Sequence, residues 1–388
     1  MAPVQQHARF PPAQVARGAE LAAIGDCSVC HTNQSGQSYA GGRAIPTPFG
    51  SIHSTNISPD PETGIGRWSL AAFQRAMRDG IDRNGRHLYP VLPYPHFTRA
   101  SDDDIGAMYA FLMTRVPIHA ARVPNELPFP IDQRVVLTGW NLLYLRPGPW
   151  RPDSDHDAVW NRGNYLVEAI GHCGACHTPH NVLGAEEAGR SLAGGDAENW
   201  YAPPLQTASP AAHPWTQQAL ASYLRTGFAA DHGAAAGPMT AVTDQLAKVP
   251  EADVSAMAIY LASLMPQSAA PQSARAVEAR SADPAARAMF DGACGGCHGA
   301  DAPMSRDGAP SLALSTAVNA PTPRGAIQII LHGIPWRETR PAPYMPSFAA
   351  VLTDAQVAQV AGYLRAAFSS KPAWSDVAAE VAKARGAS

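Results

Sequence analysis

Three copies of one short pattern, Cys-x-x-Cys-His, constrain this chain more than any other feature. The copies are Cys27-Ser28-Val29-Cys30-His31, Cys173-Gly174-Ala175-Cys176-His177 and Cys294-Gly295-Gly296-Cys297-His298, and they contain all 6 cysteines of the chain. Two thiols at this spacing can each add to one vinyl group of a haem, while the adjacent histidine places its imidazole on the iron. The pattern therefore predicts three covalently bound haem c groups.

Structural zinc and disulfides are the alternatives for paired cysteines. A zinc site needs four ligands, usually two such pairs or one pair with two spaced histidines. The three pairs are far apart in the sequence, and none has a second pair nearby. We therefore favour haem at all three.

Composition excludes some partners and indicates a location. A net charge of −3 with 16% charged residues lacks the basic surface that nucleic-acid binding requires. No apolar stretch approaches the roughly 18 to 20 residues that span a bilayer. Residues 1–9 lack the features of a secretory signal, yet haem is attached to such motifs outside the bacterial cytoplasm. We expect a periplasmic protein, numbered from after a removed leader and peripherally associated with the outer face of the inner membrane.

A helical pattern repeats around each motif. A short helical run is predicted before each motif, and a second helix well after it begins with capping-type polar residues and carries apolar residues at helical spacing. The predicted first helices are Val15–Asp26, Trp160–Gly171 and Asp283–Gly292, and the predicted second helices are Ser101–Leu112, Glu251–Leu261 and Thr353–Leu364. This is the plan of a class I cytochrome c domain. We predict an all-α fold of three such domains in tandem, with long irregular loops and linkers.

Two proline-rich segments suggest the domain boundaries. The predicted domains are residues 1–125, 156–266 and 282–388, the last with a carboxy-terminal tail. Residues 126–155 form an interdomain segment that includes an apolar stretch, Val135–Leu145, whose length suits a helix at a surface or an interface. Residues 267–281 form a linker.

The far face of each iron needs a second axial ligand, which electron-transfer cytochromes usually supply as methionine. Met345 and Met239, each beside a proline and shortly before a predicted second helix, are the candidates for the third and second haems. At the corresponding place in the first unit stands Leu92, which cannot bind iron. We predict His96 as the ligand there, while Met77, Met113 and His53 stay open and Met108 belongs to a core-facing position. The other histidines, among them His172 and His232, are interpreted mostly as bystanders.

Several strings resemble the triheme cytochrome c subunits of bacterial membrane-associated dehydrogenases, the alcohol, gluconate and aldehyde dehydrogenase group. They include Ser54-Thr55-Asn56-Ile57-Ser58-Pro59-Asp60, Arg162-Gly163-Asn164-Tyr165-Leu166-Val167-Glu168 before the second motif, and Trp374-Ser375-Asp376-Val377. The resemblance covers nearly the whole chain, although His53 departs from the family string. It implies an electron-transfer subunit, without catalytic residues of its own, that passes electrons from a catalytic partner to ubiquinone or another respiratory acceptor. In this family the partner carries pyrroloquinoline quinone, FAD, or a molybdenum cofactor with an iron-sulfur small subunit.

Two features resemble the cytochromes paired with molybdenum hydroxylases, which oxidise aldehydes or N-heterocycles. They are the loop from Leu92 to His96 and the run Leu246–Val254. Two other classes remain open. A catalytic multihaem peroxidase or reductase would need an iron with an exchangeable position, which the missing methionine of the first unit would leave. A free soluble electron shuttle would have no permanent partner.

Overall fold

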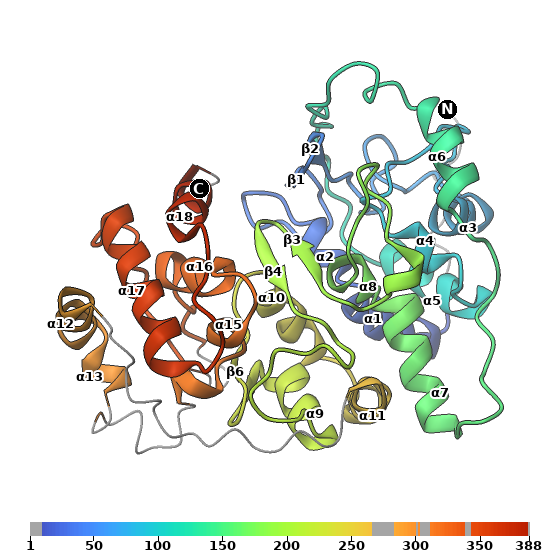
Figure 1. The fold of residues 1–388 in the computed structure, drawn as a ribbon. Coiled ribbons are helices and arrows are strands. Elements are labelled where there is room, and N and C mark those ends of the chain that lie inside the picture. The colour runs from blue at the N-terminus through green and yellow to red at the C-terminus, as the bar shows by residue number, and fades with distance from the viewer. Residues whose placement is uncertain (1–9, 266–282, 300–301, 303–310, 338–342, 387–388) are drawn as a thin grey trace. The chain divides into compact units, whose positions relative to one another are not determined.

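Helices dominate the computed structural model of this chain, which describes residues 10–265, 283–299, 302, 311–337 and 343–386 (Figure 1). The described residues divide into two compact units. Unit 1 contains residues 10–175, 182–185 and 248–253, and unit 2 contains the others. The three-domain division of the sequence analysis stays a prediction, and its linker, residues 267–281, lies outside the described residues.

Unit 1 carries the first motif and the beginning of the second. Its elements are α1 (Pro12–Ile24), α2 (Cys27–Cys30), β1 (Ala44–Thr47), β2 (Gly50–His53), α3 (Leu70–Asp79), α4 (Tyr94–Phe97), α5 (Asp102–Met113), α6 (Val136–Tyr144), α7 (Ala158–Tyr165) and the π-helical turn η1 (Leu166–Ile170). The short helix α8 (Gly174–His177), in the second motif, has residues in both units.

Unit 2 carries the third motif and most of the chain after the second. Its elements are η2 (Ala188–Arg190), β3 (Gly195–Ala197), β4 (Trp200–Ala202), α9 (Gln217–Thr226), β5 (Phe228–Ala229), β6 (Gly233–Ala234), α10 (Pro238–Leu246), most of α11 (Glu251–Leu264), α12 (Pro284–Ala293), α13 (Gly295–His298), η3 (Leu312–Leu314), α15 (Thr316–Asn319), α16 (Arg324–His332), α17 (Asp354–Phe368) and α18 (Val377–Gly386).

The predicted helices around each motif are confirmed, and so are the predicted polar starts of α5, α12 and α17. Ser101 accepts a hydrogen bond from the Asp104 amide to begin α5, and Thr353 forms a capping box with Gln356 to begin α17. Asp283 caps α12 directly before its first proline. These helix ends follow from local hydrogen bonding, which is why the sequence reveals them.

Three small antiparallel strand pairs depart from a purely helical fold. They are β1 with β2, β3 with β4, and β5 with β6. The first pairs Ala44 with His53, and the second pairs Gly195 with Ala202. The pairs are too short to bury a sheet face, so the sequence carries no alternating apolar pattern for them. They shape the loops between helices.

The core of unit 1 forms where α1 crosses α5. A Cβ placed on Gly18 would lie 1.9 Å from the carbonyl oxygen of Ala107, so the two helix backbones touch at this point. Leu21, Ile105 and Met108 are fully buried around the crossing. Burial of Met108 confirms that it faces the core.

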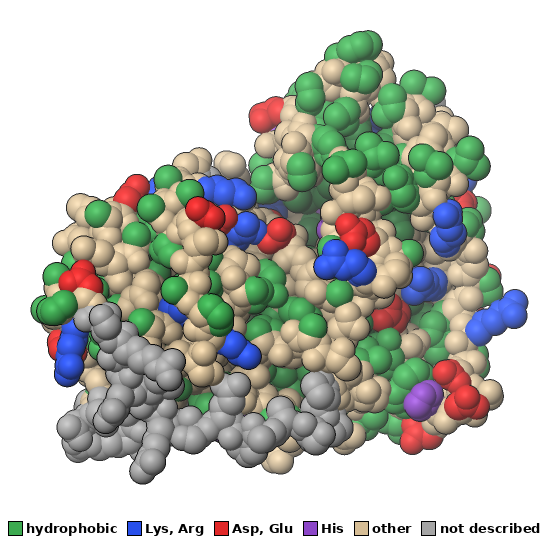
Figure 2. Space-filling model, in the orientation of Figure 1, with side chains coloured by type: hydrophobic (Ala, Val, Ile, Leu, Met, Phe, Trp, Pro, Cys, Tyr) green, Lys and Arg blue, Asp and Glu red, His purple; other side chains and the backbone are tan. Residues whose placement is uncertain are grey.

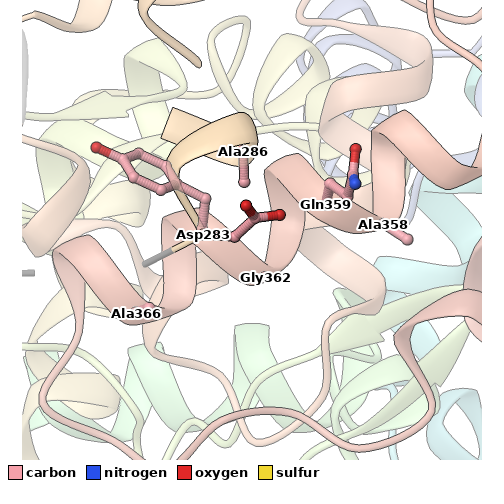
Figure 3. A pocket seen from close by; sticks show the side chains of 7 residues that line it. Asp283, Ala286, Ala358, Gln359, Gly362 and Ala366 are labelled. Atoms are coloured by element: carbon pink, nitrogen blue, oxygen red, sulfur yellow. The ribbon is translucent and has the colours of Figure 1, made fainter. Parts of the chain in front are cut away.

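In unit 2, α12 packs against α17 in the same way as predicted for the first and second helices of a domain. The rings of Phe290 and Tyr363 lie 5.0 Å apart, and Val357 and Val360 are buried with them. A hollow of about 230 Å³ opens between these helices, lined by Asp283, Ala286, Ala358, Gln359, Gly362, Tyr363 and Ala366 (Figure 3). Its lining contains no histidine, methionine or cysteine, so we do not assign it to haem.

None of the helices in the described part of the chain is long and apolar enough to cross a bilayer. The stretch Val135–Leu145 does form a helix, α6, which belongs to unit 1.

The crossing at Gly18 can be tested with a matched pair of glycine substitutions. We expect Gly18→Ala to lower the free energy of unfolding by about 1–3 kcal/mol or more, because the added methyl group separates α1 from α5. Gly362→Ala in α17 meets no atom within 4 Å, so it should raise stability by about 0.5–1 kcal/mol. Thermal unfolding followed by far-ultraviolet circular dichroism measures both. Equal effects of the two substitutions would contradict the close crossing.

Candidate haem sites

Each Cys-x-x-Cys-His motif forms a single helical turn. In the first motif the His31 amide donates to the Cys27 carbonyl at 3.0 Å, and in the third the His298 amide donates to the Cys294 carbonyl at 2.8 Å. Residues three and four positions apart share one face of such a turn. Both thiols and the imidazole of a motif are therefore presented on the same side, as attachment to one haem requires.

The proximal histidines of the first two motifs are oriented by backbone carbonyls. The Nδ1 atom of His31 lies 2.5 Å from the Thr55 oxygen, and that of His177 lies 2.6 Å from the Pro203 oxygen. When Nδ1 carries the hydrogen and donates it, the Nε2 lone pair is left for a metal ion. Burial lowers the pKa of both imidazoles despite these hydrogen bonds, and burial also lowers the pKa of His298. The neutral form that binds iron is thereby favoured.

Glycines bring a loop close to each of these two motifs. The Gly41 amide donates to the His31 carbonyl at 2.9 Å, and the Gly194 amide donates to the His177 carbonyl at 2.7 Å. A Cβ on Gly41 would lie 2.3 Å from the carbonyl carbon of Thr55. The first two motifs thus share one local architecture, although they stand far apart in the sequence.

None of the six cysteines, all of which lie in the described residues, forms a disulfide. With thiols outside any disulfide, an oriented imidazole and a loop closed over it by glycines, the first two motifs fit haem c, and the helical turn of the third presents its cysteines and histidine in the same way.

The candidate distal ligands lie in three different settings. Met345 pairs with Ile334 in an isolated β-bridge, and Met239 is the second residue of α10; both side chains are half-buried. His96 lies on α4, is 6% exposed, and its Nδ1 lies 2.8 Å from the Glu168 oxygen. The His96 imidazole therefore resembles those of His31 and His177, because its Nδ1 atom also lies against a backbone carbonyl oxygen.

The other residues left open for the first haem also have definite places. Met77 is buried on α3, and Met113 is half-buried at the end of α5. His53 ends β2, and its Nδ1 is buried without a hydrogen-bond partner. Leu92 is half-buried in the loop before α4.

His172, which the sequence analysis interpreted as a bystander, lies where the first two motif-bearing segments meet inside unit 1. Its Nε2 is 3.3 Å from the carbonyl oxygen of Gly25, two residues before Cys27, and its ring lies edge-on to Phe97. A Cβ on Gly25 would lie 3.3 Å from the Ile170 oxygen. The helices that present the first and second haem motifs therefore touch at their carboxy-terminal ends.

A cluster of charged side chains connects the same segments. Arg162 on α7 forms two hydrogen bonds of 2.9 Å with Asp253, and Arg17 on α1 contacts both Asp253 and Asp104. The hydroxyl of Tyr165 donates to Asp104 at 2.7 Å. Burial alone would raise the pKa of Asp253, but its hydrogen bonds and charge interactions with the two arginines lower it. The cluster holds α1, α5 and α7 in one arrangement.

Asp26 is an unusual residue directly before the first motif. It is 9% exposed, has a left-handed backbone with φ 49°, and its Oδ1 has no hydrogen-bond partner. Burial raises its pKa to about 7, with the charge of Lys248 acting in the opposite direction. An acid at this position is visible in the sequence, but its burial is not.

The family model described as "Cytochrome c" matches residues 15–115, 161–265 and 284–367, so each motif lies in its own matched segment. The chain therefore belongs to the cytochrome c family and carries three haem c attachment sites.

The relatives define the group within that family. The chain is 37% identical to the fructose dehydrogenase cytochrome subunit of Gluconobacter japonicus, over 92% of this chain and 80% of the relative. It is 35% identical to the gluconate 2-dehydrogenase cytochrome c subunit of Pantoea cypripedii, over 96% and 90% of the two chains. It is 47% identical to a nicotinate dehydrogenase subunit of Pseudomonas putida over 96% of its length, but spans only 32% of that relative. The chain is thus a cytochrome of the dehydrogenase-subunit type, with a role in electron transfer.

The buried carboxyl of Asp26 leads to a pH-dependent prediction. Its folded pKa lies above the unfolded value of 3.8, so the stability that this group contributes is lost as pH rises from about 4 to about 7 and does not change further above that. We expect Asp26→Asn to stabilise the protein at pH 8 by up to a few kcal/mol, at about 1.4 kcal/mol per pKa unit, and to have little effect near pH 4.

Chemical denaturation at the two pH values measures this difference. Asp155→Asn, at an exposed carboxylate, is the control and should change stability little at either pH. A gain for Asp26→Asn that is the same at pH 4 and pH 8 would contradict burial of the ionised group.

Proposed function

We propose that this chain passes electrons from a molybdenum-containing dehydrogenase, which oxidises an aldehyde or an N-heterocycle, to ubiquinone or another respiratory acceptor. The main support is the 47% identity to the nicotinate dehydrogenase relative over 96% of this chain, compared with 37% to the fructose dehydrogenase relative. The catalytic partner would carry the molybdenum cofactor and would be accompanied by an iron-sulfur small subunit. The complex would lie at the periplasmic face of the inner membrane.

A second candidate partner is a dehydrogenase with pyrroloquinoline quinone or FAD. One observation favours it: the cytochrome subunits of fructose dehydrogenase and gluconate 2-dehydrogenase match this chain over 92% and 96% of its length.

The residues of this chain have few chemical tasks in electron transfer. When bound, each haem supplies a one-electron ferric/ferrous couple whose potential depends on its axial ligands and surroundings. The carbonyls of Thr55 and Pro203 fix the orientation of the His31 and His177 rings, while burial favours their neutral form. The Arg17, Arg162 and Asp253 cluster keeps the first two motif-bearing segments in a constant relation. A constant relation between the attachment helices allows electron transfer with little rearrangement.

For the sixth ligands we propose Met345 at the third haem, Met239 at the second and His96 at the first. Burial of His96 and the contact of its Nδ1 with the Glu168 carbonyl support it, because metal-binding histidines usually donate their other ring hydrogen in this way. A bis-histidine first haem would have the lowest potential of the three, since methionine ligation raises the potential.

Single substitutions test these ligands. We expect Met239→Ala and Met345→Ala each to remove the methionine-to-iron charge-transfer absorption of one haem, and His96→Ala to convert the first haem from low spin to high spin. Electron paramagnetic resonance and visible spectra of the oxidised protein provide the measurement. His180→Ala, at an exposed histidine, should leave all three haems low spin.

Two outcomes would contradict the assignment of His96. In one, His96→Ala leaves the first haem unchanged while Met113→Ala makes it high spin. In the other, the unmodified reduced protein binds carbon monoxide at one haem, which would favour the catalytic multihaem interpretation.

Isolation of the native complex tests the partner. We expect a catalytic subunit, molybdenum and acid-labile sulfide to co-elute with the cytochrome after gentle detergent extraction of membranes. Metal analysis, flavin analysis and a reduction assay with nicotinate or an aldehyde provide the readouts. Flavin or pyrroloquinoline quinone in place of molybdenum would move the assignment to the second candidate. A cytochrome that elutes alone would favour a free electron shuttle.

A further inference from the structure

The helix α6 presents apolar side chains to solvent, unlike an ordinary surface helix. Val135, Val136, Gly139, Leu142 and Leu143 are exposed, recur at helical spacing and form one outward stripe. Val135 is 74% exposed, Leu142 83% and Leu143 56%. Such an exposed apolar stripe is not expected on a helix whose only role is to cover the core with its apolar face.

The polar side chains of α6 are bonded to the rest of unit 1 instead. The hydroxyl of Thr138, an exposed residue at the edge of the stripe, lies 3.0 Å from Nε2 of His87. The Asn141 amide oxygen accepts from the Tyr94 hydroxyl at 2.6 Å, and Arg134, just before the helix, donates to the His87 carbonyl at 2.6 Å. These hydrogen bonds fix the rotation of α6, so it cannot turn its apolar stripe into the protein without breaking them.

Neighbouring loops extend the apolar stripe. Phe129, in the loop before α6, is 82% exposed. The Trp140 indole donates to the Leu183 carbonyl at 3.0 Å, which brings Val182, 91% exposed, next to the helix. Hydrophobic side chains gather over the region where Figure 1 places α6 (Figure 2). Isolated apolar side chains at a surface are normal, but a contiguous group of this kind marks an interaction site.

The segment that contains the stripe, residues 116–151, has a positive net charge, whereas the whole chain carries −3. Residues 116–151 contain four arginines, Arg122, Arg134, Arg146 and Arg151, and only two acids, Glu126 and Asp132. Arg134 lies near Arg122 and Arg86, while the nearby Asp82 has the opposite charge and pairs with Arg86 at 3.0 Å. Phospholipid headgroups of negative charge complement the remaining positive charge of this segment.

We propose that the outward stripe of α6, with Phe129 and Val182, is the face by which this cytochrome inserts into the surface of an anionic bilayer. An amphipathic helix with basic residues at its border binds a membrane by laying its apolar face among the headgroups. Side chains that project from the surface fit a deformable lipid layer better than the rigid surface of a protein. The inference rests on the proposed function, because ubiquinone is dissolved in the membrane and the cytochrome must approach it.

Vesicle binding by the full-length holo-cytochrome tests this face. The unmodified protein should co-sediment with vesicles of phosphatidylcholine and phosphatidylglycerol, and less with phosphatidylcholine alone, with binding that weakens at high salt. The double variant Phe129→Gln/Leu142→Gln should bind the anionic vesicles at least about tenfold more weakly, because two apolar side chains no longer leave water. Leu142→Met, which stays apolar, should bind like the unmodified protein.

The matched control is Val351→Gln, which replaces a 71% exposed apolar residue of unit 2. It should bind vesicles like the unmodified protein. Haem spectra and thermal unfolding identify any misfolded variant. Because all the substituted side chains are exposed, we expect every variant to fold correctly.

Three results would overturn the proposal. The unmodified protein could fail to bind anionic vesicles, or the double variant could bind them as well as the control does. The double variant could instead keep vesicle binding but lose the dehydrogenase during detergent purification, which would make this face a docking site for a protein partner. A failure of the proposed function is separate, because it would appear as the absence of any dehydrogenase from preparations of the unmodified protein.

Discussion

The short turn that holds two cysteines and a histidine on one side is the constraint on which this structure depends. Such a turn can present the imidazole to iron only if the ring is prevented from rotating. In the first two motifs a backbone carbonyl, from Thr55 or Pro203, accepts the Nδ1 hydrogen and fixes the ring. The loops that supply these carbonyls approach the motif closely, which requires glycine at residues such as Gly41. In each of these two motifs, the loop that follows therefore positions one carbonyl oxygen beside the imidazole.

The features predictable from the sequence are those that arise within a few residues. The motifs, the capped helices α5 and α17 and the core-facing Met108 all depend on local spacing, so their pattern is visible directly. The carbonyls of Thr55 and Pro203 could not be predicted in this way. Every residue has a carbonyl, and only the folded path of the loop determines which one meets the imidazole.

Contacts between distant segments are the second group that the sequence does not reveal. His172 stands directly before Cys173, and nothing in the sequence predicts that its imidazole contacts the Gly25 carbonyl. Similarly, Asp253 lies at the start of a predicted helix, where an acid is expected for capping and helix-dipole reasons alone. Its contacts with Arg17 and Arg162 give it a second role in joining the first two motif-bearing segments within unit 1.

The helix α6 shows that a correct prediction of a helix need not tell which of its side chains face solvent. The apolar run Val135–Leu145 predicts a helix packed against something, and periodicity alone would place its apolar side toward the protein. Its few polar groups decide otherwise, since buried polar atoms need hydrogen bonds and Asn141 finds one with Tyr94, which is itself completely buried. Satisfying these polar groups within unit 1 leaves Leu142 and Leu143 exposed, although Leu137 is buried. Exposure of apolar side chains has an unfavourable hydration free energy, and a membrane surface would remove that cost at the place where the proposed quinone acceptor is dissolved.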